Sequence, residues 1–220
     1  MKILFLAKKN KPFSRNAAEL IKLHIDENTI VFGELNDPFP SKLLIERFDY
    51  LLSYVSPWIV PKELLSNISK ASINFHPGPP EYPGIGCTNF AIYNRERDFG
   101  ITVHHMEEGV DSGSIITVER FPLLPNDSVY SLTQRCYVYI YVAFVKIFHL
   151  IISGSVLPES EESWKRKPYT RKELNSLCAI TKDMPANEVI RRIKATTYPN
   201  MPGAFIEMFG YKFVFSEEDR

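Results

Sequence analysis

Short apolar runs separated by polar segments dominate the first half of the chain. The runs Lys2–Ala7, Thr29–Gly33, Asp49–Ser56 and Ala71–Phe75 are typical of strands buried on both faces of a parallel sheet. Between them, residues 14–25, 41–48 and 61–67 have helical patterns that open with a serine or a proline. Alternating strands and helices predict an α/β fold, with a Rossmann-like, mainly parallel sheet and helices on both of its faces.

The middle of the chain predicts two more strands and two more helices. Residues 88–96 have a helical pattern, and residues 100–106 and 113–123 have the pattern of strands. Residues 136–154 are apolar, but Lys146 and His149 interrupt them, and the uninterrupted run is shorter than the ~20 residues of a membrane span. We therefore predict no membrane span here, but a long helix buried against the sheet and capped by Asn126 or Asp127.

From about Gly154 the pattern changes. Residues 155–174 are polar and rich in breakers, which predicts an exposed connection. A short helix at 186–197 and a hairpin about Gly210 follow. The chain thus divides into a core of residues 1–153 and an appendage of residues 154–220. Because a lone hairpin is marginal in water, we expect it to pack on the core or on a second copy of the chain, and we predict a homodimer.

Charge and cysteine content narrow the function classes. Lys plus Arg number 26 and Asp plus Glu number 26, so no net charge draws the chain towards nucleic acid. Cys87, Cys136 and Cys178 lack CxxC spacing, which favours a reducing, cytoplasmic compartment and disfavours a metal site. The apolar run at the N-terminus is too short for a signal peptide.

Polar side chains follow the fourth predicted strand. Asn74 and His76 are two residues apart, so both point to one face, and a loop rich in proline and glycine follows. Asp111 lies between Gly109 and Gly113, in a loop that can bend towards the same end of the sheet. Each residue alone more often serves as a turn former, a structural histidine or a loop cap. Together they offer an oxyanion donor, a proton carrier and its carboxylate partner, which favours direct acyl transfer over a covalent intermediate on Cys87.

These residues carry a family resemblance. The segments "NFHPGPPEYPGIGCTNFAIYN" and "GITVHHMEEGVDSGSII" resemble the catalytic core of the formyltransferases that use 10-formyltetrahydrofolate, which include the glycinamide ribonucleotide, methionyl-tRNA and nucleotide-sugar formyltransferases. The resemblance implies that Asn74, His76 and Asp111 form the catalytic triad, with His104 as a structural support. The segment "LLSYVSPWIVP" is similar to the folate-binding segment of the family. It implies folate contacts from Tyr54, Val55, Met106, Glu107, Glu108 and Val110.

The end of the chain resembles one branch of this family. "IKATTYPNMPGAFI" is similar to the segment that begins the C-terminal part of methionyl-tRNA formyltransferases, but the residues after Ile206 are too few for their barrel domain. The loop "HPGPPEYPG" also differs from the "HPSLLPxYxG" of the tRNA and purine enzymes. Both features resemble the short nucleotide-sugar N-formyltransferases, whose C-terminal hairpin often helps form a dimer.

The expected reaction is formyl transfer from 10-formyltetrahydrofolate to the amine of a nucleotide-linked, dTDP amino dideoxy sugar, for a surface polysaccharide such as lipopolysaccharide O-antigen. Lys8, Lys9, Asn10 and Arg15 follow the first strand and could bind the pyrophosphate, or form a solvated charge run. Tyr82 and Tyr198 could stack on the base or sugar, or be buried. The alternatives are a methionyl-tRNA formyltransferase, a formyl-folate hydrolase and a folate- or nucleotide-binding protein without catalysis.

Overall fold

The main body of the molecule is built on a six-stranded mixed sheet. The structure is a computed structural model that describes residues 1–216. The strand order is β2-β1-β3-β4-β5-β6, and β5 alone runs against the other five. The strands are β1 Ile3–Lys8, β2 Asn28–Gly33, β3 Phe48–Tyr54, β4 Ile68–His76, β5 Asp98–His105 and β6 Ile115–Pro122. The prediction of a mainly parallel sheet from four leading strands is confirmed, and the reversal at β5 places two further strands beside them.

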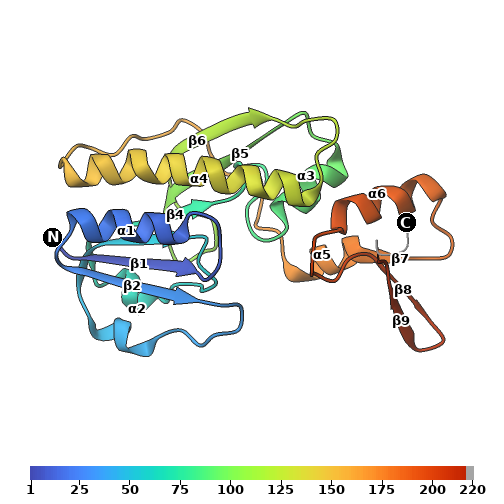
Figure 1. Cartoon of the computed structure of the whole chain (residues 1–220), viewed down its shortest axis with the longest axis horizontal. Helices are drawn as coiled ribbons and strands as arrows, with labels where there is room; N and C mark the ends of the chain where they lie inside the picture. The colour runs from blue at the N-terminus through green and yellow to red at the C-terminus, as the bar shows by residue number, and fades with distance from the viewer. Residues whose placement is uncertain (217–220) are drawn as a thin grey trace.

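Helices cover both faces of this sheet. They are α1 Ser14–His24, the 3-10 turn η1 Ser41–Ile45, α2 Lys62–Leu65, α3 Cys87–Asn94 and α4 Val129–Ile152. Figure 1 shows α1 and α4 side by side on one face and α2 on the other. Side chains alternate along β1, so that Phe5 packs with Phe144 of α4 while Leu4 and Leu6 face Leu64 of α2. Residues 41–48, predicted as a helix, form only the short turn η1 because Phe48 already begins β3.

Helix α4 is the central element of the core. Within residues 1–216 it is the one helix long and apolar enough to cross a membrane by length and composition alone. In the structure it packs on the sheet through buried side chains such as Ile140, Phe144 and Ile147. Its N-cap is Ser128, whose hydroxyl accepts from the Ser131 amide, so the predicted cap was misplaced. Asp127 instead accepts from Arg135.

A smaller unit follows the core in the chain. It contains α5 Arg171–Cys178, β7 Ala179–Ile180, α6 Ala186–Thr196, β8 Phe205–Met208 and β9 Tyr211–Val214. The predicted hairpin is confirmed as β8 and β9, which join β7 in a three-stranded sheet. Helix α6 packs on α3, where Asn89 donates to the main-chain oxygen of Ala195. Figure 1 shows this unit at one end of the core, with the hairpin extending away from it.

The connection between core and smaller unit is largely exposed, as predicted, but main-chain hydrogen bonds attach it to the core. We call residues 155–170 the strap. Main-chain amides of Ser160, Lys165 and Tyr169 donate to the carbonyl oxygens of Ile115, Pro80 and Pro83 at 2.8 to 3.0 Å. The strap therefore runs along the loop after β4 and the start of β6, where the predicted site residues lie.

Candidate active site

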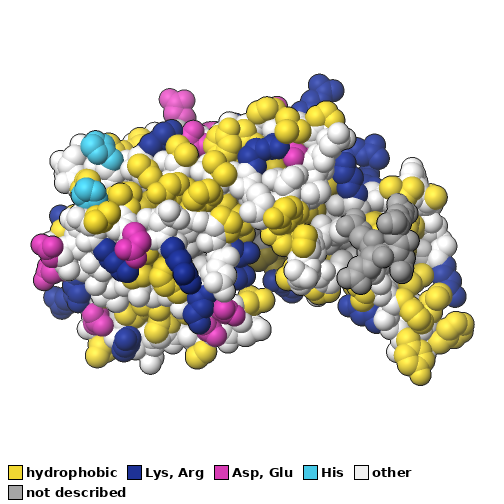
Figure 2. Space-filling view, viewed as in Figure 1, with side chains coloured by type: hydrophobic (Ala, Val, Ile, Leu, Met, Phe, Trp, Pro, Cys, Tyr) yellow, Lys and Arg dark blue, Asp and Glu magenta, His cyan; other side chains and the backbone are white. Residues whose placement is uncertain are grey.

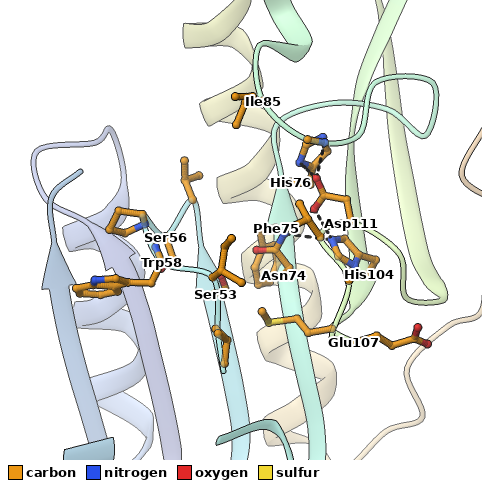
Figure 3. Close-up of a pocket in the computed structure, with 18 of the residues that line it drawn as sticks. Ser53, Ser56, Trp58, Asn74, Phe75, His76, Ile85, His104, Glu107 and Asp111 are labelled. Atoms are coloured by element: carbon orange, nitrogen blue, oxygen red, sulfur yellow. Dashed lines mark hydrogen bonds and ion pairs between the residues drawn. The ribbon is translucent and has the colours of Figure 1, made fainter. Parts of the chain in front are cut away.

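The predicted polar residues meet at the carboxyl end of β4. Asn74 and His76 point to the same side, and Asn74 is the direct cross-strand partner of His104 on β5. After β5 the chain turns back, and Asp111 sits at the end of this turn with a left-handed φ of 43°. Figure 3 shows His76 and His104 on either side of Asp111, with Asn74 next to His104. Residues 37 apart in sequence therefore share one site.

Asp111 is the centre of the hydrogen-bond network. Its Oδ2 accepts from the Gly84 amide at 2.7 Å and lies 3.2 Å from Nδ1 of His76. Its Oδ1 lies 3.2 Å from Nε2 of His104 and 3.4 Å from the amide nitrogen of Asn74. One carboxylate thus orients both imidazoles and the amide.

The remaining ring nitrogens define where protons sit. Nε2 of His76 lies 2.9 Å from the main-chain oxygen of Tyr82, and Nδ1 of His104 lies 2.7 Å from that of His105. A carbonyl oxygen only accepts, so each of these nitrogens bears a proton and donates it. A second proton that reaches Nδ1 of His76 would then be shared with Asp111.

Asp111 stays ionised in this buried position. Burial by itself would raise its pKa, but His76, His104 and the Gly84 amide outweigh burial and lower the pKa to about 2. The side chain is 8% exposed. The site therefore holds a fixed negative charge beside the imidazoles at neutral pH.

The amide of Asn74 belongs to this network. Its nitrogen lies 3.1 Å from Nε2 of His104 and donates to Oδ1 of Asp111 over a longer distance, 3.4 Å. A primary amide has two N–H groups, and the one in the longer contact is the one that a ligand oxygen can take over. Asn74 lines a cavity, as do His76 and Asp111, and this N–H can meet the oxygen of a bound carbonyl there.

This first cavity has a volume of about 300 Å³. Its walls are the loop after β3, the end of β4 and the loop after β5. Of the predicted folate contacts, Val55, Met106, Glu107, Glu108 and Val110 line it. Val55 has a left-handed φ of 48°, an uncommon conformation for a β-branched residue, at the bend that forms the wall. Tyr54 does not line the cavity, because its ring is buried among Phe5, Phe75 and Phe144.

Trp58, which lies in the predicted folate-binding segment but was not singled out there, forms a wall of this cavity. Its indole N–H donates to the main-chain oxygen of Asp37 at 2.9 Å, and its ring lies against Gly33 at the end of β2. A Cβ at Gly33 would lie 2.1 Å from the ring. Only glycine there admits the tryptophan.

A second cavity of about 320 Å³ lies between the core and the smaller unit. Lys8 and Tyr198, both predicted to bind substrate, line it together with Lys11, Arg171 and Lys212. Burial lowers the pKa of Lys11, and Lys8 lowers it further. Lys9, Asn10 and Arg15 do not line this cavity. Only Lys8 of the predicted pyrophosphate-binding residues therefore lines the cavity. The smaller unit adds two cations that were not predicted, Arg171 and Lys212.

Tyr82 is not the stacking surface that we predicted. Its ring is buried against Phe99 and Tyr169, and its hydroxyl donates to Glu96. Its main-chain oxygen instead accepts from His76. Tyr82 therefore acts on the site through its backbone.

Cys87 is unsuited to be a nucleophile. Its thiol donates to the main-chain oxygen of Pro77, and burial raises its pKa to about 12. Within residues 1–216, no group of histidine, cysteine and acidic side chains has the arrangement of a metal site. Asn74, His76 and Asp111 offer acid–base and hydrogen-bond chemistry at the site.

Trp164 of the strap is the contact that sequence reasoning missed. Its ring meets that of His104 edge to face, with centroids 5.0 Å apart and an interplanar angle of 88°. It meets His76 at 5.9 Å and 77°. No motif marks this residue, because it lies in a polar segment far along the chain.

The chain is similar to known formyltransferases in sequence and in fold. Residues 49–146 match the family model described as formyl transferase. The trifunctional purine biosynthetic protein adenosine-3 of Chironomus tentans is 41% identical over 85 residues, which are 38% of this chain and 6% of that protein. GDP-perosamine N-formyltransferase of Brucella melitensis biotype 1 is 26% identical over 163 residues, 74% of this chain and 62% of that protein. The chain spans only 6 to 7% of the length of the curated relatives that it matches first.

Solved structures share the fold over almost the whole chain. A sugar N-formyltransferase from a Shewanella species superposes with a TM-score of 0.78 at 19% identity, covering 98% of this chain and 96% of that one. An N-formyltransferase from Helicobacter canadensis, solved with folinic acid and dTDP-3-aminofucose, gives 0.73 at 20% identity, covering 96% and 85%. The resemblance to the formyltransferase family is confirmed, and so is the formyltransferase fold with a small additional C-terminal sheet.

Proposed function

We propose that this chain, whose residues 49–146 belong to the formyl transferase family, transfers a formyl group from 10-formyltetrahydrofolate to the amine of a nucleotide-linked amino sugar. The observation that supports this best is the convergence of Asn74, His76 and Asp111 beside the first cavity. The fold neighbours named as sugar N-formyltransferases point to the same acceptor class.

The first cavity suits the formyl donor. Its wall residues include apolar Val55, Trp58 and Met106, which fit the flat ring of a pterin, and Glu107 and Glu108 lie at one side. Asn74 and His76 lie on the same cavity, so a formyl carbon carried by such a ring can reach them. The Helicobacter canadensis neighbour, solved with folinic acid, supports a folate as the donor.

The second cavity suits the nucleotide. Lys8, Lys11, Arg171 and Lys212 supply positive charge for a pyrophosphate, and the rings of Tyr137 and Tyr198 offer surfaces for a base. Ile85 lines the first cavity, and Thr88, three residues later, lines the second. The segment 85–88 therefore borders both cavities, and we expect a sugar bound to a nucleotide in the second cavity to extend past this segment towards His76.

The reaction follows from these positions. The neutral amine forms a bond to the formyl carbon, while the N–H of Asn74 that makes the long contact with Asp111 turns to the developing oxyanion and stabilises it. His76 and Asp111 take up the proton that the amine loses, shared between Nδ1 and the carboxylate at 3.2 Å. The bond from the formyl carbon to N10 of the folate then breaks, and that nitrogen regains a proton. Binding both substrates at fixed positions lowers the entropic part of the barrier.

Finer assignments are part of the proposal. We expect a dTDP-linked amino dideoxy sugar, as in the Helicobacter canadensis complex, and a role in making surface polysaccharide such as lipopolysaccharide O-antigen. The GDP-perosamine relative makes a guanine nucleotide the first competitor to test. Both substrates are cytoplasmic metabolites, so we place the reaction in the cytoplasm.

A turnover assay tests this function. A panel of dTDP-, GDP- and UDP-amino sugars is incubated with 10-formyltetrahydrofolate, and a gain of one formyl mass identifies the acceptor. We expect Asn74→Ala to lower kcat by roughly 100- to 1,000-fold, and His76→Ala to remove most of the transfer. Formate release without any sugar would identify a hydrolase, and formylation of charged initiator tRNA would identify the tRNA enzyme. Unchanged transfer by His76→Ala would contradict the proton-handling role.

A further inference from the structure

We propose that Trp164 is a positioning residue that holds His76 and His104 against Asp111 and keeps water away from them. This inference rests on the proposed function and adds a residue outside the segment that matches the family model. Trp164 does not line the first cavity, so it covers the two imidazoles from another side.

The indole is fixed in place by its own hydrogen bond and by the strap. Its Nε1 donates to the main-chain oxygen of Gly113 at 2.9 Å. The adjacent amide of Lys165 donates to Pro80 at 3.0 Å, and that of Ser160 to Ile115 at 2.9 Å. The ring is therefore held by the segment just after Asp111 and by the loop after β4.

The two ring contacts orient the imidazoles. Edge-to-face pairs at 5.0 and 5.9 Å are attractive, and they restrict rotation of the histidine rings about their last torsion. Each imidazole is also held by one carbonyl oxygen and by Asp111. Without the indole, each ring would lose the packing that keeps its nitrogens in line with the carboxylate.

The same contact controls the access of water. His76 is 4% exposed and His104 2% exposed, although both lie close to the strap at the surface of the core. Trp164 itself is only half-buried and its ring contacts both imidazoles, so it separates them from solvent. Water that entered in its place could attack the formyl carbon instead of the amine. The structure thus assigns Trp164 an effect on the ratio of hydrolysis to transfer.

Three variants separate these effects. Trp164→Leu keeps apolar volume without a ring, Trp164→Phe keeps an aromatic edge, and Lys165→Ala is the matched control on the same strap, with an exposed side chain and an unchanged main-chain bond. We expect Trp164→Leu to lower kcat by about 10- to 100-fold with KM for both substrates nearly unchanged. It should also release more formate for each sugar formylated. Trp164→Phe should recover most of the rate, and Lys165→Ala should match the parent protein.

A second measurement does not depend on turnover. Nuclear magnetic resonance of the histidine ring protons should show displaced His76 and His104 signals in Trp164→Leu and unchanged ones in Lys165→Ala. If the parent protein formylates no sugar, the proposed function fails, while these signals still report on positioning. Parent-like kcat, formate release and ring signals in Trp164→Leu would overturn the inference.

Discussion

At the scale of single residues, the site depends on the charge of Asp111. The carboxylate is buried and the backbone of Asp111 is in a left-handed conformation, and both features cost free energy. Hydrogen bonds and ion pairs from Gly84, His76 and His104 offset that cost. The residue is therefore as important for the local structure as for proton transfer.

The pH dependence of stability tests this account. The pKa of Asp111 falls from 3.8 to about 2 on folding, so the ionised side chain adds about 2 kcal/mol to the free energy of unfolding at neutral pH. Because the folded-state pKa is the lower one, this contribution is complete above pH 4 and is lost as the pH falls towards 2. Asp111→Asn lacks it. We expect urea unfolding to show the largest difference between parent and variant above pH 4, and a narrowing difference below. A difference independent of pH would contradict the assignment.

The sequence predicted the converging residues but not their surroundings. Asn74 and His76 could be placed because a strand has a period of two, and Asp111 because two glycines flank it. The buried position of Tyr82 could not be predicted, because its hydroxyl donates to Glu96, and only the packed structure determines this partner. Trp164 could not, because its contacts with His76 and His104 join segments whose distance in space no local pattern encodes.

At the scale of elements, the loop after β4 and the strap depend on each other. Gly84 has a φ of +86°, and a Cβ there would lie 2.4 Å from the main-chain oxygen of Tyr169. The same two residues form an isolated bridge, and Ile85 donates to Tyr169 at 3.1 Å. The absence of a side chain at Gly84 thus allows the strap to approach Asp111.

A matched pair of glycine variants measures this approach. In Gly154→Ala the added Cβ has no atom within 4 Å, so the only cost is that of alanine in a left-handed backbone conformation. This cost is about 1 kcal/mol of the free energy of unfolding. Gly84→Ala has the same conformational cost, and its Cβ would also clash with the main chain of Tyr169. We therefore expect Gly84→Ala to lower the free energy of unfolding by clearly more than Gly154→Ala, measured by urea denaturation, and to impair formyl transfer. Equal losses in the two variants would show that the strap is not held at Gly84.

Helices and strands with strong apolar patterns were predicted, whereas helix ends that depend on capping residues were not. The apolar strands β1 to β4 were recognised from their composition. Helix α5 was missed, although Thr170 and Glu173 form a capping box that a search for the T-x-x-E pattern could have found. Ser14, the serine with which the first predicted helix opens, is the first helical residue, and Phe13 occupies the cap position in a left-handed conformation. The reversal of β5 depends on sheet pairing between distant segments.

At the scale of the whole molecule, two apolar surfaces remain uncovered. Figure 2 shows hydrophobic side chains along α4 and at the end of the hairpin. On the hairpin, Phe209, Tyr211 and Phe213 are 89%, 70% and 52% exposed. Within residues 1–216, strand β9 is also an edge of its sheet, the kind of strand that can pair with another chain. These features favour association through the hairpin.

We expect the protein to be a homodimer, with twice the 25.4 kDa of the chain, because pairing would bury these rings. The double variant Tyr211→Glu, Phe213→Glu places charges on alternate residues of β9 and should give monomers in multi-angle light scattering. Val156→Glu alters a side chain that is 91% exposed and lies outside the hairpin, so it should leave the mass unchanged. A monomeric parent protein at micromolar concentration would contradict this expectation.

The contact between Trp58 and Gly33 has a wider consequence. Gly33 ends the outermost strand of the sheet, yet the room it leaves sets the position of a ring that bounds the first cavity. Substitutions of Gly33 or Trp58 could change the shape of the first cavity while Asn74, His76 and Asp111 stay in place. Ligand preference and reactivity are therefore separable traits in this scaffold, and related chains could diversify the first while preserving the second.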